Sequence, residues 1–529
     1  MTERTLISGG LVVDGTGRPG QIGDVLVDDG VIVGVGRWPD GHLEAQSVDA
    51  AGMVVAPGFI DLHTHADYSI LAFPDAASAL RQGVTTVAVG NCGGGIAPIG
   101  DSHDIRPVAF AYQPEWGVET DWRTFPEYID RLGGLGVNVA AIVPHGALRN
   151  SVLGINARPA TSAELDAMAA ALDDALDAGA VGMSTGLQYR PGCWAPASEI
   201  RRLVEIVGSH GRMYATHMRD RSERYADAIR ESLEAVYDTD AHLQLSHVAP
   251  RPNARHPVIV EAYELMAAVS ASGRRFGVDT FPEPWGPGLL VDLFPSELMD
   301  GDTSQVLARL RDSSVRAEME AHIDAGSSFL ARVAGYDDIY LSWVPERPDL
   351  VGACLGTVAD PSQGLGAFCC DVLLEAGERL RQVGIRHIYA DEAALRDVLA
   401  FGFCSVASDG IVTSGEDAAA PLLWSASTYG FTARLFEHYV RGAPLLSLEE
   451  AVRRLTSLPA SALGLADRGT LAVGARADLV VFDPSRIHDR SSPEEMARHP
   501  AGISAVIVNG SIAVDSEGLT GVRAGRLAT

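Results

Sequence analysis

Apolar positions alternate between two patterns from about residue 57 to residue 410. Short apolar runs rich in Val, Ala and Ile are separated by longer segments, such as 162–180 and 223–238, in which Ala, Leu, Glu and Arg recur at helical spacing. We interpret the short runs as buried strands and the longer segments as helices. Eight strands in alternation with helices favour a (β/α)8 barrel over an open doubly wound sheet. The strand candidates are 57–65, 85–93, 137–146, 180–187, 213–220, 242–249, 274–282 and 404–410.

The two ends of the chain show a different pattern. Short β-branched runs broken by Gly and Asp turns occur before residue 57, and runs of the same texture return after residue 468. We therefore predict one small β-sandwich built from both termini, residues 1–56 plus 467–529. The barrel would occupy residues 57–466.

One stretch inside the barrel range does not fit the alternation. It runs from about residue 285 to residue 397, between the seventh and eighth strand candidates, and is far too long for an ordinary loop. We predict an inserted lobe there. The expected fold class is α/β: a (β/α)8 TIM barrel with a β-sandwich from both termini and a lobe between strands 7 and 8.

Side chains that bind metals fall at the ends of the predicted strands. His63 and His65 end the first strand, and their i, i+2 spacing puts both side chains on one face. The carboxyl ends of barrel strands form a single face, so residues far apart in the sequence meet there. Six residues share this position: His63, His65, Cys92, His217, His247 and Asp409.

Each of these residues taken alone has a structural explanation. A strand-end His can be a hydrogen-bonded core residue, a lone Cys a small buried hydrophobe, and an Asp before Gly a turn residue. All six at strand ends favour a metal site instead. Imidazole, thiolate and carboxylate together suit zinc, and Cys92 could bridge two ions.

Zinc with an open coordination position determines the predicted reaction. It lowers the pKa of a bound water towards ~7 and polarises a carbonyl group. Asp409 could then take the proton of the water and pass it to the leaving group. The reaction class that follows is hydrolysis at an acyl carbon.

Composition excludes several other function classes. The 529-residue chain has 69 acidic and 41 basic residues and a formal charge of −28, which disfavours binding to nucleic acid or an anionic membrane. It contains no lysine, which excludes Schiff-base lysine chemistry and a carboxylated lysine bridging two metals. The six cysteines are too scattered for a disulfide framework, and we find neither a signal peptide nor a transmembrane stretch. We expect a cytoplasmic protein that acts on a small molecule; the sequence leaves open whether it is a homo-oligomer.

Seven segments spread over the chain carry motifs of a known group of enzymes. They are PGFIDLHTHAD (57–67), GVTTVAVGNCGGGIAP (83–98), GAVGMSTGLQYRPG (179–192), YATHMRD (214–220), LQLSHVAP (243–250), ASDG (407–410) and SLEEAVRRLTSLPASALGLADRGTLAVGARADLVVFDP (447–484). In these segments the chain resembles the D-aminoacylase (N-acyl-D-amino-acid deacylase) branch of the amidohydrolase superfamily, over nearly all its length. The GxxADLVVFD part of the last segment marks only the superfamily, whereas the seven together indicate the branch.

The resemblance implies a barrel with a β-sandwich and a particular set of ligands. One zinc ion would be held tightly by Cys92, His217 and His247. A second, weakly occupied site would consist of His63, His65 and Asp409, with Cys92 as the bridge.

The resemblance also implies roles for residues around the metal. Asp409 would be the general acid and base. Tyr189 matches a position that in such enzymes helps to bind the scissile carbonyl, with an ordinary packing tyrosine as the alternative. His145 is a candidate for the substrate pocket, although we prefer the alternative that it caps its own loop.

The chain departs from the family where the family binds the substrate's carboxylate. The family uses a Lys soon after the strand-six His, tyrosines of a D-x-Y-P-Y element, and an Arg of an H-P-R element. Here these places read His247-Val248-Ala249, Asp279-Thr280-Phe281-Pro282-Glu283 and Trp424-Ser425-Ala426. A carboxylate without these donors would remain unpaired, at a cost of roughly a few kcal/mol.

The substituted residues predict an altered substrate. Phe281, Trp285 and Trp424 would form an apolar, aromatic pocket, and Glu283 would repel a carboxylate if it points inward. We therefore expect a neutral or cationic amide. Arg251 is the nearby cation that could form a rearranged carboxylate clamp instead.

The leading prediction is a zinc-dependent amidohydrolase that cleaves a linear C–N acyl bond other than a peptide bond. One alternative is an N-acyl-D-amino-acid deacylase with its carboxylate clamp at Arg251. Another is hydrolysis of a cyclic amide or lactone by the same mechanism. A non-catalytic scaffold is disfavoured, because such a protein should have lost metal-type residues and this chain keeps all six.

Overall fold

Eight parallel strands form the central barrel of the protein, whose computed structural model describes residues 4–38, 45–101, 104–360, 362–415, 425–491 and 496–529. The strands follow one another around the sheet in chain order, and a bridge between Thr64 and Gly410 joins the last strand to the first. Side chains and helices cover both faces, so the strands are buried along their length, which explains their continuous apolar runs. The barrel strands are β6 (Phe59–Asp61), β7 (Val84–Val89), β8 (Asn138–Pro144), β9 (Gly182–Gly186), β10 (Met213–His217), β11 (His242–Leu245), β12 (Phe276–Thr280) and β16 (Cys404–Val406).

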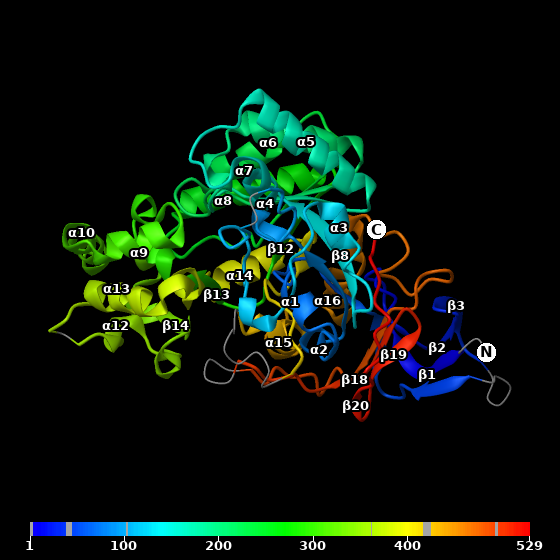
Figure 1. Ribbon diagram of the computed structural model, residues 1–529. Coiled ribbons are helices and arrows are strands. Elements are labelled where there is room, and N and C mark those ends of the chain that lie inside the picture. The colour runs from blue at the N-terminus through cyan, green and yellow to red at the C-terminus, as the bar shows by residue number, and fades with distance from the viewer. Residues whose placement is uncertain (1–3, 39–44, 102–103, 361, 416–424, 492–495) are drawn as a thin grey trace.

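Helices between the strands cover the outside of the barrel (Figure 1). The sequence sets where they begin: in α5 the Thr161 side chain accepts the backbone N–H of Glu164, and the Glu164 carboxylate accepts the backbone N–H of Thr161. Their apolar stripes join the strand side chains in the largest core of the molecule. The helices are α4 (His145–Leu153), α5 (Ser162–Asp177), α6 (Ala197–Ser209), α7 (Tyr225–Ala235), α8 (His256–Ala271), α14 (Glu392–Leu399), α16 (Leu448–Leu455) and α17 (Ser457–Leu463).

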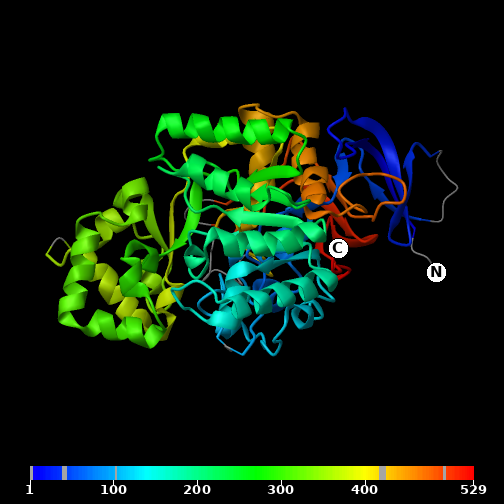
Figure 2. The same cartoon turned by 90° about the horizontal axis from the view of Figure 1, so that it is seen from above.

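Both ends of the chain contribute to a nine-stranded sheet beside the barrel. The two halves join where β5 pairs antiparallel with β17, and their inward side chains, including Ile7, Val27 and Ile507, form a separate core. Figures 1 and 2 show this sheet, blue and red, on the side of the barrel away from the lobe. Its strands are β1 (Thr5–Val12), β2 (Gln21–Asp28), β3 (Val31–Gly36), β4 (Gln46–Asp49), β5 (Val54–Pro57), β17 (Leu479–Phe482), β18 (Ile503–Val508), β19 (Ser511–Asp515) and β20 (Gly518–Leu519).

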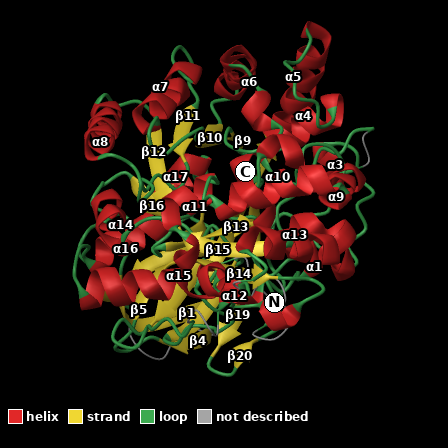
Figure 3. Cartoon of the chain, turned by 90° about the vertical axis from the view of Figure 1, so that its left-hand side faces the viewer, coloured by secondary structure: helices red, strands yellow, loops and turns green. Residues whose placement is uncertain are grey.

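A lobe with its own hydrophobic core lies between β12 and β16, and it faces the viewer in Figure 3. Helix α14 falls inside the range expected for the insertion, but its Leu395 and Val398 pack in the main core, so the core of the lobe ends earlier, at Ile385. A three-stranded sheet of β13 (Trp285–Leu289), β14 (Ile339–Trp343) and β15 (Gly384–Ile388) connects the lobe to the barrel. The helices of the lobe are α9 (Thr303–Arg311), α10 (Ser313–Asp324), α11 (Phe329–Ala334), α12 (Leu355–Val358) and α13 (Leu365–Ala376).

Short helices and the last residues of the chain complete the barrel. Gly525 and Leu527 form bridges with Leu135 and Val139, and Ala528 is buried in a further apolar cluster. Among the described residues, no helix is both long and apolar enough to cross a bilayer. Apart from short 3-10 helices, the remaining helices are α1 (Ser69–Ala72), α2 (Ala77–Leu80), α3 (Phe125–Ile129), α15 (Ser427–Arg434) and the π-helix Leu435–Gly442.

The fold class predicted from the sequence is confirmed. The parallel barrel, the sheet built from both ends of the chain and the lobe between the seventh and eighth barrel strands are all present. Because all eight strands run the same way, their carboxyl ends lie on one face of the barrel.

Candidate metal centre

Cys92 lies at the centre of a cluster of imidazole rings at the carboxyl ends of the strands. Its Sγ is 3.2 Å from His63 Nε2, 3.4 Å from His247 Nε2 and 3.8 Å from His217 Nδ1. His217 Nδ1 is in turn 2.9 Å from His247 Nε2. A tetrahedral zinc ion would hold nitrogen and sulfur ligands about 3.3 to 3.6 Å apart, so the distances from Cys92 are close to those of a site for one ion, and the rings of His217 and His247 would move slightly apart to bind it.

A second group of ligand atoms adjoins the first. His65 Nε2 lies 3.0 Å and His63 Nε2 3.5 Å from Asp409 Oδ1. His63, Cys92 and His247 form one group of ligand atoms close enough together to hold a cation, and His63, His65 and Asp409 form a second group that shares His63 with it. All six residues that the sequence predicted as ligands thus lie in one cluster, almost entirely buried.

Three of these residues have unusual backbone conformations. Cys92, His247 and Asp409 have φ angles of 53°, 34° and 52°, in the left-handed region that residues other than Gly seldom adopt. Each follows the end of a strand, so the turn points its side chain into the mouth of the barrel. Conformations of this cost persist where the surrounding structure enforces them, and they occur often at functional sites.

Neighbouring side chains fix the orientation of two rings. Asp279 Oδ1 lies 3.2 Å from His63 Nδ1 and also accepts the backbone N–H of His247 at 2.7 Å. Gln188 Oε1 lies 2.9 Å from His217 Nε2. With a cation bound, a proton on each of these outer nitrogens would leave the lone pairs of His63 Nε2 and His217 Nδ1 for the cation beside Cys92.

The electrostatics of the cluster favour the metal-binding forms of Cys92, His217 and His247. Burial opposes a thiolate, but His63 and His65 outweigh it and lower the pKa of the Cys92 thiol. Burial, reinforced by nearby positive charges, lowers the pKa of both His217 and His247, so these rings are neutral. Thiolate and neutral imidazole are the forms that bind a divalent cation.

His63 and His65 behave differently from the other two rings. Burial lowers the pKa of both rings, but neighbouring negative groups outweigh it. Cys92 and Asp279 raise the pKa of His63 well above its usual value. Asp409 and Cys92 raise the pKa of His65 to about 9. These two rings hold protons that balance the thiolate and the carboxylates. A cation would compete with those protons for the same nitrogen atoms.

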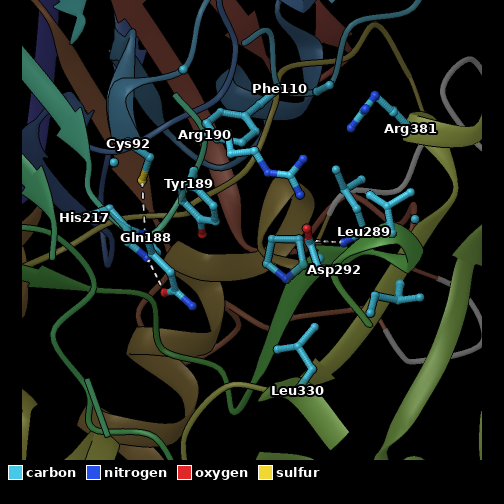
Figure 4. A pocket seen from close by; sticks show the side chains of 18 of the residues that line it. Cys92, Phe110, Gln188, Tyr189, Arg190, His217, Leu289, Asp292, Leu330 and Arg381 are labelled. Carbon is cyan, nitrogen blue, oxygen red and sulfur yellow. Dashed lines mark hydrogen bonds between the residues drawn. The ribbon is translucent and has the colours of Figure 1, made fainter. Parts of the chain in front are cut away.

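A cavity of about 700 Å³ opens above the cluster, between the barrel and the lobe. Cys92, Tyr189 and His217 lie at one side of it, and Asp292 and Leu330 of the lobe lie across from them (Figure 4). Six arginines line it against three carboxylates, of which Asp409 is one. The cavity is therefore positively charged, although the whole chain is strongly acidic.

Comparison with known proteins assigns the chain to a family. The sequence profile described as "Amidohydrolase family" matches residues 46–336 and 405–514. The D-aminoacylase of Alcaligenes xylosoxydans xylosoxydans is 32% identical over 526 residues, which cover 99% of this chain and 96% of that protein. The chain belongs to the amidohydrolase family. It is accordingly a hydrolase of carbon–nitrogen bonds other than peptide bonds.

Further relatives place this amidohydrolase near deacylases. N-acyl-D-glutamate deacylase of Alcaligenes xylosoxydans xylosoxydans is 32% identical over 510 residues, 96% of this chain and 92% of that protein. The crystal structure of a D-aminoacylase matches with a TM-score of 0.82 and 31% identity, covering 99% of both chains. N-acyl-D-glutamate deacylase from Bordetella bronchiseptica, solved with zinc and a phosphonate inhibitor, matches with a TM-score of 0.81 and 29% identity, again over 99% of both chains.

Arg251 of this amidohydrolase lies on the cavity wall, where the sequence placed a candidate clamp. It is 5% exposed, and its Nε and Nη1 have no hydrogen-bond acceptor in the described part of the chain. Its guanidinium lies 4.9 Å from the ring centre of Phe329. Burial, with help from the neighbouring Arg221, lowers its pKa to about 10, which still leaves it charged at neutral pH.

Three residues expected at the pocket wall lie elsewhere. Phe281 is 1% exposed and packs behind Tyr389, with 4.3 Å between ring centres, so that Tyr389 lines the cavity in its place. Glu283 turns away from the cavity and accepts a hydrogen bond from Ser427 at 2.9 Å. Trp285 packs against other residues of the lobe hairpin and does not line the cavity.

His145 and Tyr189 differ in their position relative to the cavity. His145 is fully buried and does not line the cavity; its Nε2 lies 2.9 Å from Glu199 Oε1, beside Arg149. Tyr189 does line it, with its ring centre 4.3 Å from that of His217. Trp424 lies outside the described residues.

The sequence interpretation missed several residues that surround the cluster. Gln188 directly precedes Tyr189, and Asp279 is an acidic residue inside an otherwise apolar strand, so both carried a signal. Arg221 donates to the carbonyl oxygens of His247 and Ala249 at 2.6 and 3.2 Å. Nothing in the local sequence shows that an arginine four residues after a strand turns back onto the next one.

Proposed function

We propose that the protein is a zinc-dependent deacylase of N-acyl-D-amino acids, with Arg251 as the residue that binds the substrate's carboxylate. The observation that carries the proposal is the guanidinium of Arg251, buried on the cavity wall with two nitrogens that have no acceptor among the described residues. A buried cation without an anionic partner is costly, and a carboxylate with two oxygens matches its planar donors.

This proposal replaces the neutral or cationic amide expected from the sequence. That expectation depended on Glu283 and a wall of aromatic residues, and Glu283, Phe281 and Trp285 do not line the cavity. The alternative, in which Arg251 binds the carboxylate, is supported by the burial of the Arg251 side chain and by its position on the cavity wall. The D configuration is proposed from the relatives, which are named for N-acyl-D-amino acids.

All six residues of the cluster are of kinds that bind zinc, and Cys92, His217 and His247 also have the protonation that a bound cation requires. We assign Cys92, His217 and His247 to a tight site, and the remaining three residues, with Cys92 shared, to a weaker one. Zinc, when bound there, lowers the pKa of a bound water towards ~7 and polarises a carbonyl oxygen. The ligands of the weaker site are His63, His65 and Asp409.

Two residues of the chain would act on the substrate itself. Asp409, at the edge of the cavity, accepts a proton from the attacking water and returns it to the leaving nitrogen. The Tyr189 hydroxyl would donate to the scissile carbonyl, and burial raises its pKa well above its usual value, so the phenol keeps its proton. Hydrolysis then releases a carboxylic acid and a free amino acid.

Hydrolysis of a cyclic amide has weaker support. The L-hydantoinase of Arthrobacter aurescens shares the fold with a TM-score of 0.56, but at 15% identity this likeness concerns the fold alone. A simple cyclic amide without a carboxylate substituent would also leave Arg251 unpaired.

The test compares a substrate acid with its uncharged counterpart. The zinc-loaded enzyme should hydrolyse at least one member of a panel of N-acetyl-D-amino acids, and that acid better than its carboxamide. Arg251→Met should lower kcat/KM for the acid by about 100-fold, because the carboxylate would lose a charge-assisted partner. Arg106→Met is the matched control, since Arg106 also lines the cavity but is exposed and paired with Asp104.

Two results would contradict the proposal. One is faster hydrolysis of the carboxamide than of the acid by the unmodified enzyme. The other is equal loss of activity in the Arg251 and Arg106 variants, which would show that the effect comes from the general charge of the cavity.

A further inference from the structure

Asp292 is a carboxylate that faces the cavity opposite the metal cluster. It belongs to a short 3-10 helix, Leu290–Leu293, where the lobe begins. One oxygen, Oδ2, accepts the backbone N–H of Leu289 at 3.1 Å, and Oδ1 has no hydrogen-bond partner among the described residues. Figure 4 shows Asp292 across the cavity from Cys92 and His217. The backbone thus fixes the carboxylate and leaves one oxygen available to a ligand.

The arginines around Asp292 have other partners. Arg190 pairs with Asp300 at 2.7 Å. Arg381 donates to the carbonyl oxygens of Met299 and Gly301 at 2.7 and 3.0 Å. Neither guanidinium forms an ion pair with Asp292 within the part of the chain that the structure describes.

The charge of Asp292 is therefore only partly balanced. Its side chain is exposed to the cavity, but the protein packed around it partly desolvates the carboxyl and raises its pKa, even though Arg190, Arg381 and Arg251 act to lower it. A carboxylate in this position gains free energy from a ligand that supplies an N–H donor or a positive charge. A second carboxylate placed there would be repelled.

We propose that Asp292 is the side-chain specificity residue of this enzyme and that it binds the ammonium or guanidinium end of a basic amino-acid side chain. The inference rests on the proposed function, because it takes the other end of the substrate, the carboxylate, to be bound by Arg251. An N-acyl amino acid with a basic side chain carries one negative and one positive group, which match Arg251 and Asp292.

The surroundings of Asp292 suit the rest of such a side chain. Leu289 and Leu330 also line this part of the cavity, and Figure 4 shows them on either side of Asp292. Apolar walls that lead to a single carboxylate match an aliphatic chain that ends in a cation. Residues of the lobe supply these walls, so the lobe would determine which side chain the enzyme accepts.

The experiment measures a ratio of rates. With zinc-loaded enzyme, kcat/KM is determined for N-acetyl-D-arginine, N-acetyl-D-norleucine and N-acetyl-D-glutamate. The unmodified enzyme should prefer arginine to norleucine by about tenfold or more, because one charge-assisted hydrogen bond is gained, and glutamate should be the poorest substrate. In Asp292→Asn the preference for arginine over norleucine should fall by about tenfold.

A matched control separates Asp292 from the other charges of the cavity. Glu378 also lines the cavity and, like Asp292, is exposed, and Glu378→Gln should leave the ratio unchanged. Zinc content and circular dichroism of each variant report whether it has folded. The substrate preference of the unmodified enzyme tests the inference even if Asp292→Asn does not fold.

The outcomes distinguish the two proposals. Suppose that N-acyl amino acids are hydrolysed and that the rate depends on Arg251. If the norleucine substrate is then cleaved at the same rate as the arginine substrate, or if Asp292→Asn has the same arginine-to-norleucine ratio as the unmodified enzyme, the role of Asp292 is wrong and the proposed function stands. If the enzyme hydrolyses none of the panel of N-acetyl-D-amino acids, both proposals are overturned.

Discussion

Glu283 shows how burial changes the behaviour of a single residue. Its side chain is 5% exposed and accepts a hydrogen bond from Ser427, and Arg434 and Asp489 are the charged groups that act on it. Burial, only partly opposed by Arg434, raises the pKa of its carboxyl from 4.5 to about 7. At pH 6 the folded protein therefore keeps a proton on Glu283 that the unfolded chain releases.

This shift predicts a pH-dependent effect of Glu283→Gln. The folded pKa is the higher one, so the contribution of Glu283 to stability is fully present below about pH 4.5 and is lost as the pH rises through about 7. Gln carries no charge at any pH and can still accept from Ser427. The melting temperature of the variant minus that of the unmodified protein should be larger at pH 8 than at pH 5. Thermal melts at both pH values measure this, and an unchanged difference would contradict it.

The position of a site residue could be predicted from the sequence where the fold alone determines which way its side chain points. His63, Cys92, His217 and Asp409 meet because parallel strands bring their carboxyl ends to one face, and this follows from the alternation of strands and helices. Phe281 could not be placed in this way, because its direction depends on the packing of Tyr389, more than a hundred residues later.

At the scale of elements, the lobe is attached through one hairpin-like pair of strands. Leu289 at the end of β13 pairs with Gly384 at the start of β15, so the chain leaves and re-enters the lobe at neighbouring points. The core of the lobe is separate from that of the barrel. The lobe nevertheless supplies Asp292 and Phe329 to the cavity wall.

Removal of the lobe should separate metal binding from substrate binding. We expect a variant in which a short Gly-containing turn replaces residues 290–383 to fold and to keep its zinc, because the ligands all lie on the barrel. Its kcat/KM should fall by about 100-fold or more, because the substrate would no longer be held in position. Circular dichroism, metal analysis and kinetics on the same preparation measure the three properties. Full activity in this variant would mean that the lobe does not bind substrate.

The insertion was recognisable from the sequence because no ordinary loop is so long, but its inner boundary was not. Helix α14 has the same amphipathic pattern as the helices of the lobe, and its assignment to the barrel depends on what Leu395 and Val398 contact. A pattern of apolar residues shows that a helix has a buried face, and it does not show which core receives that face.

At the scale of the whole molecule, Asp478 connects the terminal sheet to the barrel. Its side chain is 3% exposed and accepts from Arg468 at 2.5 Å and from Asn138, the first residue of β8, at 3.1 Å. It also accepts the backbone N–H of Asn509 at 2.7 Å. Strands from distant parts of the chain therefore meet at one buried carboxylate.

The loss of this carboxylate should destabilise the protein. Asp478→Ala removes the buried partner of Arg468, which keeps only the half-exposed Asp467. It also removes an acceptor from the Asn138 side chain and from the backbone N–H of Asn509, and the whole change costs about 3 to 5 kcal/mol. Asp75→Ala is the control, because the Asp75 side chain is 45% exposed and its exposed pair with Arg523 contributes at most about 1 kcal/mol. Urea unfolding followed by fluorescence compares the two midpoints. Equal midpoints would contradict the role given to Asp478.

The pairing of β5 with β17 also sets a delay during protein synthesis. More than 400 residues separate Pro57 from Leu479, and the whole barrel and lobe are translated between them. At about 5 to 20 residues per second, β5 waits on the order of 20 to 80 seconds for its partner. During that time an apolar strand edge is exposed on the ribosome. Slower growth at lower temperature, or a chaperone that covers such an edge, should therefore raise the yield of folded enzyme.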